Sequence, residues 1–141
     1  MKKYIALFLA VLMVLSMTAC GSQTTPEKYT LKLSHYRADG AQADLDAKAF
    51  AANVAAADDS LEVVIYPAAQ LGDYTTVQEL VSVGDVEMQM ATLSSTVDKF
   101  LGITSAPYIC STWDEAKAIF NRDSEFTKSI SEHLAKQNIK L

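Results

Sequence analysis

The two histidines are the side chains in this sequence most suited to acid–base or metal chemistry, and they lie far apart. His35 follows a short alternation of apolar and polar residues, whereas His133 falls in a helical pattern near the end of the sequence. Neither belongs to an HxxxH or HExxH pattern, and neither has a cysteine at the spacing of a metal site. We predict no metal site, and we interpret His133 as a residue on the surface or rim of a helix.

The sequence also gives no support for catalysis by a nucleophilic side chain or by a pair of carboxylates. The sequence has no GxSxG element, no glycine-rich phosphate loop and no cysteine with a histidine placed to act as its base. The neighbours Asp58 and Asp59 are interpreted as the end of a helix rather than as an acid–base pair. We therefore predict that the protein is not an enzyme and uses no cofactor.

One cysteine has a predicted chemistry because of what precedes it. Two lysines and the uninterrupted apolar residues 4–15 form a secretory signal, which is too short for a transmembrane helix of about 20 residues. Small residues then lead directly into Cys20, and this element resembles the lipobox of bacterial lipoproteins, with Met17 in place of the usual Leu, Val or Ile. The resemblance implies that Cys20 carries a lipid that holds the exported protein at the outer face of the membrane or in the periplasm. The alternatives are cleavage of a plain signal and an uncleaved anchor.

Net charge and length restrict the partners and the number of folded units that the remainder of the chain can have. The formal net charge is −5, and both lysines of the signal belong to the basic residues, so an exported part would be more acidic still. Such a surface repels nucleic acid, and no nucleic-acid partner is predicted. The length suits one folded unit, which we place at residues 30–141, after the signal at 1–20 and a polar, flexible tether at 21–29. Cys110 is expected to be a small buried residue, the alternative being a reactive thiol.

The first elements follow from hydrophobic periodicity. Residues 29–34 alternate and predict a strand. The alanine-rich residues 41–57 predict an amphipathic helix. Its expected apolar side consists of Leu45, Ala49, Phe50, Ala52, Val54 and Ala57. Residues 61–66 are apolar and β-branched, which predicts a buried strand.

The second half repeats this plan. A short helix with an apolar face over 77–81 is expected to end at Gly84, followed by a third strand over 86–91 and a loop over 92–96. Thr112 and Glu115 have the spacing of a capping box, so a helix should begin there. A second helical stripe consists of Phe126, Ile130 and Leu134. Residues 139–141 are predicted to begin a further strand.

Strands that alternate with helices at this spacing predict an α/β fold with a mainly parallel sheet flanked by helices. In such sheets the ligand crevice lies beyond the carboxyl ends of the strands. The loops at 35–40, 67–74 and 92–96 occupy such places, and so would a segment after Leu141.

Several motifs agree in order and distance with one family. LKLSHY at 31–36, the helix around Phe50 and the Tyr-Pro-x-x-Gln-Leu-Gly element at 66–72 resemble the solute-binding proteins of tripartite ATP-independent periplasmic (TRAP) transporters, of the dicarboxylate-binding, DctP-like type. The resemblance extends over about residues 30–141. It implies part of the first lobe of a type II periplasmic-binding-protein fold.

The resemblance also implies a function. Such a protein closes around a small organic acid, a C4-dicarboxylate or a sugar acid, and delivers it to the permease subunits in the membrane without performing chemistry on it. Carried over by position, it assigns ligand contacts to the loops after the strands and to the start of the second helix. These predicted site residues are Ser34, His35, Tyr36, Tyr74, Thr92, Leu93 and Ser94.

Arg37 is added to the site because its guanidinium is suited to a carboxylate. Each residue has a structural alternative: rim packing for Tyr36 and Tyr74, a core position for Leu93, helix capping for Thr92 and Ser94, and a solvated loop position for Arg37.

The family's main carboxylate-binding arginine and its second lobe come after the position equivalent to Leu141. We therefore expect this sequence to represent a truncated or split binding protein, the first portion of lobe one. The alternative is a short surface lipoprotein that uses half a binding fold as an interaction module.

Overall fold

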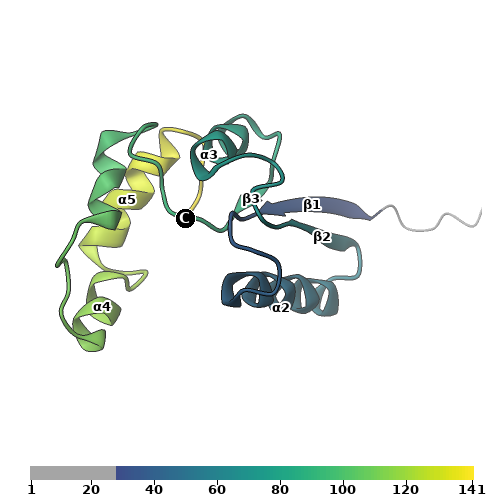
Figure 1. Ribbon diagram of the computed structural model, residues 1–141, viewed down its shortest axis with the longest axis horizontal. Coiled ribbons are helices and arrows are strands. Elements are labelled where there is room, and N and C mark those ends of the chain that lie inside the picture. The colour runs from purple at the N-terminus through teal and green to yellow at the C-terminus, as the bar shows by residue number, and fades with distance from the viewer. Residues whose placement is uncertain (1–27) are drawn as a thin grey trace, which may run out of the picture.

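The computed structural model describes residues 28–141, so the predicted signal, Cys20 and residues 21–27 of the tether lie outside the described residues. Its centre is a three-stranded parallel sheet in the order β2-β1-β3. The strands are β1 (Tyr29–Ser34), β2 (Leu61–Tyr66) and β3 (Met88–Gln89). Helices α2 (Gln42–Ala57) and α3 (Tyr74–Val83) connect them and lie on opposite sides of the sheet in Figure 1. The predicted α/β class with a parallel sheet flanked by helices is confirmed.

The first two predicted strands are present, but burial does not alternate along either of them. β1 is central and pairs with β2 from Tyr29 opposite Leu61 to Ser34 opposite Tyr66. Its carboxyl end is the buried end, with Leu33 and Ser34 4% and 1% exposed. β2 is half-buried along most of its length rather than fully buried as predicted, because it is an edge strand covered mainly by α2.

The third strand is shorter than the predicted 86–91. Only Met88 and Gln89 pair with β1. The amides of Asp85 and Val86 instead donate back to the carbonyl of Leu80 at the end of α3. The carboxylate of Glu87 accepts the backbone N–H of Lys32 at 2.6 Å, so that donor is not available to a strand ladder.

The predicted apolar side of α2 is wrong. Leu45 and Phe50 are 50% and 41% exposed, whereas Ala47 is fully buried. Asp44, in the first turn of the helix, is also fully buried. The buried positions of the helix are therefore a small side chain and a hydrogen-bonded carboxylate, which hydropathy does not select.

The remaining elements form a second group of helices, on the left in Figure 1. They are the 3₁₀ helix η2 (Lys99–Ser105), which the sequence did not predict, α4 (Trp113–Ile119) and α5 (Glu125–Ala135). Leu101, Ile130 and Leu134 form their core. This confirms the predicted stripe on α5, and the Thr112 capping box is present as predicted.

Two predictions near the C-terminal end of the sequence differ from the structure. The helix α5 ends at Ala135, and Asn138 has a left-handed backbone with φ of 59°. Residues 139–141 then leave the helix, but they form no strand with the described sheet. Cys110 is half-buried rather than buried. Among residues 28–141, no helix has the length and apolar character needed to cross a membrane.

Candidate functional site

A cavity of about 520 Å³ lies beyond the carboxyl ends of β1 and β3. Four predicted site residues line it: Tyr36 and Arg37 from the loop after β1, and Thr92 and Leu93 from the loop after β3. We call this space the arginine cavity. Its position agrees with the rule that ligands bind at the carboxyl ends of parallel strands.

Tyr36 connects the two loops. Its hydroxyl lies 3.3 Å from Oγ1 of Thr92, and its ring lies 4.8 Å below the guanidinium carbon of Arg37. The tilted ring of Tyr74 is 6.1 Å from the Tyr36 ring between centroids, so Tyr74 contacts the site through Tyr36 although it does not line the cavity. The aromatic ring orients the guanidinium and leaves its N–H groups free for an acceptor.

Arg37 forms no ion pair with any carboxylate among residues 28–141. No carboxylate of these residues therefore occupies the donors of its guanidinium. A planar fork of N–H groups is suited to the two oxygens of a carboxylate. The arrangement supports binding of an organic anion.

Three predicted site residues do not reach the cavity. Ser34 is 1% exposed at the end of the central strand. Ser94 is equally buried, its Oγ lies 2.8 Å from Oγ1 of Thr75, and its amide donates to the side chain of Gln78. His35 is 2% exposed and lies against α2 instead of the cavity. The resemblance assigned these three residues to the ligand by position, whereas in the structure they are buried away from the arginine cavity.

His35 belongs to a buried network centred on Asp44. Nε2 of His35 lies 3.2 Å from Oδ1 of Asp44, and the amide of Gly40 donates to Oδ2 at 2.9 Å. Lys48, one turn further along α2, pairs with both Asp44 and Asp39. The hydrogen bonds from Lys48 and from the amide of Gly40 hold the pKa of Asp44 well below its usual range. The hydrogen bond of Lys48 to Asp39, which has the larger effect, and its hydrogen bond to Asp44 raise the pKa of Lys48 to about 12.

The far wall of the arginine cavity was not predicted. It includes Phe126, Thr127 and Ile130 from α5, together with Thr104 and Ser105 at the end of η2. Phe126 and Ile130 had been recognised only as a helical stripe, and the spacing i, i+4 does show that they share a face. The position of this face opposite Arg37 depends on long-range packing, which a single sequence does not reveal.

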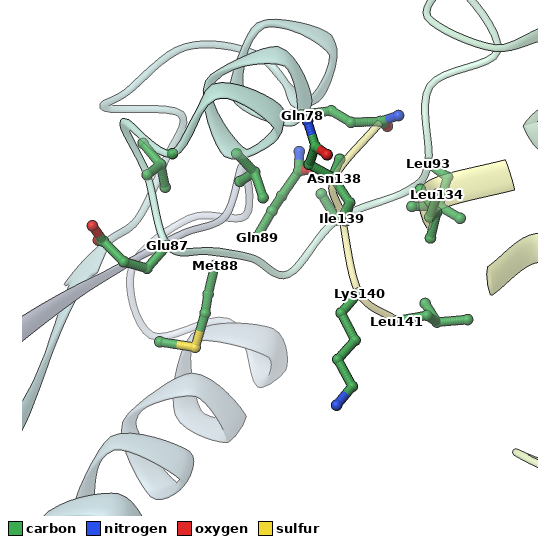
Figure 2. A pocket seen from close by; sticks show the side chains of 14 residues that line it. Gln78, Glu87, Met88, Gln89, Leu93, Leu134, Asn138, Ile139, Lys140 and Leu141 are labelled. Carbon is green, nitrogen blue, oxygen red and sulfur yellow. The ribbon is translucent and has the colours of Figure 1, made fainter. Parts of the chain in front are cut away.

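A second cavity, of about 430 Å³, lies along the outer edge of β3, and we call it the edge cavity. Figure 2 shows Met88 and Gln89 on one side and the extended residues 138–141 on the other, with Gln78 above them. In the described sheet β3 pairs only with β1, so its outer edge faces this cavity without a strand partner. Of the predicted site residues, only Leu93 lines it.

His133 lies at the rim of its helix, which agrees with the prediction. Its Nδ1 lies 2.7 Å from Oδ2 of Asp98, with the two side chains 27% and 24% exposed, and its ring stacks on Phe100 at 3.9 Å between centroids. This hydrogen bond is the main cause that lowers the pKa of Asp98. The pair ties η2 to α5. Among residues 28–141 no three His, Cys, Asp or Glu side chains are grouped as a metal site.

The architecture is that of a periplasmic-binding-protein-like lobe, and solved structures of that class match it. A TRAP periplasmic solute-binding protein from Haemophilus influenzae with bound L-gulonate is 25% identical with a TM-score of 0.69, over 79% of this chain and 37% of its own. The sugar acid binding protein of Advenella mimigardefordensis in complex with galactonate matches at 15% identity and a TM-score of 0.70, over 79% of this chain and 36% of its own. An extracytoplasmic solute receptor of Bordetella pertussis binding pyroglutamic acid matches at 22% identity and a TM-score of 0.70, over 80% of this chain and 38% of its own.

The family is shown by a sequence model. The model of the bacterial extracellular solute-binding proteins, family 7 (DctP), matches residues 33–141, and this chain therefore belongs to that family. It is a family of solute-binding proteins and not a class of enzymes. A search of curated proteins gives no match. The chain spans a little over a third of the length of the solved relatives that it matches.

Proposed function

We propose that this chain is the extracytoplasmic solute-binding component of a TRAP transporter, or the first portion of one, and that Arg37 binds the carboxylate of a small organic acid for delivery to the permease subunits. The observation that carries the proposal is the free guanidinium of Arg37 at a cavity between two strand ends. Family membership and the sugar acids and other organic acids bound by the matched structures support it. Hydroxyl groups of Thr92, Thr104 and Ser105 line the same cavity and suit a hydroxylated acid.

Calorimetry tests the proposal. We expect the full chain, purified in detergent micelles, to bind galactonate saturably with a dissociation constant of about 1 mM or weaker, because it contacts the acid from one side only. Galactose, which lacks the carboxylate, should give only heats of dilution. A micromolar constant would show that residues 1–141 enclose the acid unaided and would refute the one-sided site. Identical heats from galactonate and galactose would refute the role of the carboxylate.

Anchoring through a lipid on Cys20 remains part of the proposal, since Cys20 lies outside the described residues. It rests on the lipobox resemblance in the sequence. Replacing Cys20 by serine should release the protein from the membrane fraction of a bacterial host or leave its signal uncleaved, because no thioether can form. Cys110→Ser is the matched control and should remain in the membrane fraction with its lipid mass detected. Lipid mass retained in Cys20→Ser would contradict the assignment.

One observation favours the alternative, a surface lipoprotein that acts as an interaction module. The outer edge of β3 is unpaired within the described sheet, and Trp113 and Tyr108 are 82% and 97% exposed. Unpaired edges and exposed aromatic residues favour association with other chains. Sedimentation of the full chain in detergent separates the two functions: a defined complex with no response to galactonate supports the interaction module, whereas a response to galactonate supports solute binding.

A further inference from the structure

One buried carboxylate contacts both ends of the loop that carries Arg37. Oδ1 of Asp44 bonds to the ring of His35, and Oδ2 accepts the backbone N–H of Gly40. The side chains of Asp44 and His35 are both fully buried, and neither lines the arginine cavity. This network does not touch the space where a ligand would lie, yet it encloses the residues that do.

Other bonds hold each end of the loop separately, and at the returning end Lys48 pairs with Asp39 at 2.8 Å. The amide of Ala69 donates to the carbonyl of His35, and the amide of Ala68 donates to the carbonyl of Arg37. These bonds fix the backbone where it leaves β1. On the return path towards α2, Gly40 has a positive φ of 78°, and its amide bonds to Asp44. Asp44 is therefore the group that joins the departing and returning ends of the loop.

The position of the carboxylate favours this role. Asp44 lies in the first turn of α2, where the helix dipole stabilises a negative charge, and Lys48 pairs with it from the next turn. Burying a carboxylate is costly unless hydrogen bonds and an opposite charge compensate. An apolar side chain of similar size would fill the space at less cost but could not bond to His35 and Gly40 together. The distinctive effect of the charged Asp44 is therefore the geometry that its two hydrogen bonds impose on the loop.

We propose that Asp44 is a positioning residue for ligand binding, which acts through His35 and Gly40 to fix Arg37 and Tyr36 at the arginine cavity. The inference rests on the proposed function for the identity of the ligand as an organic acid. The effect of Asp44 on the loop does not depend on a ligand, so an experiment without ligand can test it.

The ligand-free test is backbone relaxation by NMR on the full chain in detergent micelles. In the unsubstituted protein the amide of Arg37 should show an order parameter near the rigid value of about 0.85, and in Asp44→Asn it should fall below about 0.6. The amide group of asparagine cannot accept hydrogen bonds through both of its terminal atoms. Asp46→Asn is the matched control, because Asp46 is exposed on the same helix and bonds only to Gln42. An Arg37 order parameter unchanged in Asp44→Asn would overturn the proposal.

The second test separates positioning from stability. Asp44→Asn should weaken galactonate binding about tenfold, which corresponds to about 1.4 kcal/mol. Ala47→Gly destabilises the same helix from a fully buried position without a bond to the loop, and it should leave the dissociation constant within about twofold. If Asp44→Asn and Ala47→Gly have the same stability and lose the same affinity for galactonate, the proposal is overturned.

A second pair of variants, at His35, tests the proposal if Asp44→Asn does not fold. His35→Gln retains a donor near Nε2 and should retain the order of Arg37, whereas His35→Leu should lose it; equal order in both would contradict the assignment. Failure of the unsubstituted chain to bind galactonate would count against the proposed function alone, because the relaxation comparison needs no ligand.

Discussion

Replacing Leu101 by alanine should lower the free energy of unfolding by about 2–5 kcal/mol, the range for truncating a fully buried leucine. Leu101 is 0% exposed and packs with Ile130 and Leu134 in the core of the second helical group. This apolar contact joins η2 to α5, together with the Asp98–His133 pair and the stacking of Phe100 on His133. The variant should also loosen the far wall of the arginine cavity.

Urea denaturation followed by circular dichroism measures the change. Ile103→Ala is the control, since Ile103 lies in the same 3₁₀ helix but is 40% exposed, and it should cost less than about 1 kcal/mol. Similar losses in the two variants would show that η2 is not held by its buried leucine.

Replacing Arg37 by glutamine should weaken the binding of galactonate by about 10–100-fold, because it removes a charge-assisted hydrogen bond to the carboxylate worth about 1.5–3 kcal/mol. Lysine should recover only part of this affinity, since an ammonium group lacks the planar fork that fits two oxygens. The affinity is read from NMR titration, which remains accurate for millimolar dissociation constants.

The only other arginine provides the control. Arg122 is exposed between α4 and α5 and does not line the arginine cavity. Arg122→Gln makes the same change of net charge and should leave the affinity unchanged. Equal weakening in both variants would mean that galactonate responds to overall charge and not to a site at Arg37.

The sequence predicted the elements that local rules control. The strand β1, the stop at Gly84 and the capping box at Thr112 depend on neighbouring residues, and all three are present. The strand ends carry the arginine cavity because parallel strands present their carboxyl ends together. Four of the eight predicted site residues line that cavity for this reason.

The errors share a physical origin in tertiary packing. Leu45 and Phe50 were assigned to the buried side of α2 from hydropathy, but the fully buried residues of the helix are Ala47 and Asp44, which is hydrogen-bonded to His35. His35 was assigned to the site by its position in the family resemblance, and the structure shows its ring bonded to Asp44, nine residues along the chain and buried with it. Nothing in a local pattern distinguishes a buried, paired histidine from one that faces a ligand.

The central claim is that a carboxylate binds at Arg37, and resonance mapping on the isotopically labelled full chain tests it most directly. Addition of galactonate should shift the resonances of Tyr36, Arg37 and Thr92 first and most, whereas galactose at the same concentration should shift none of them. Shifts confined to the edge cavity around Met88 and Ile139, or equal shifts with both sugars, would contradict the claim.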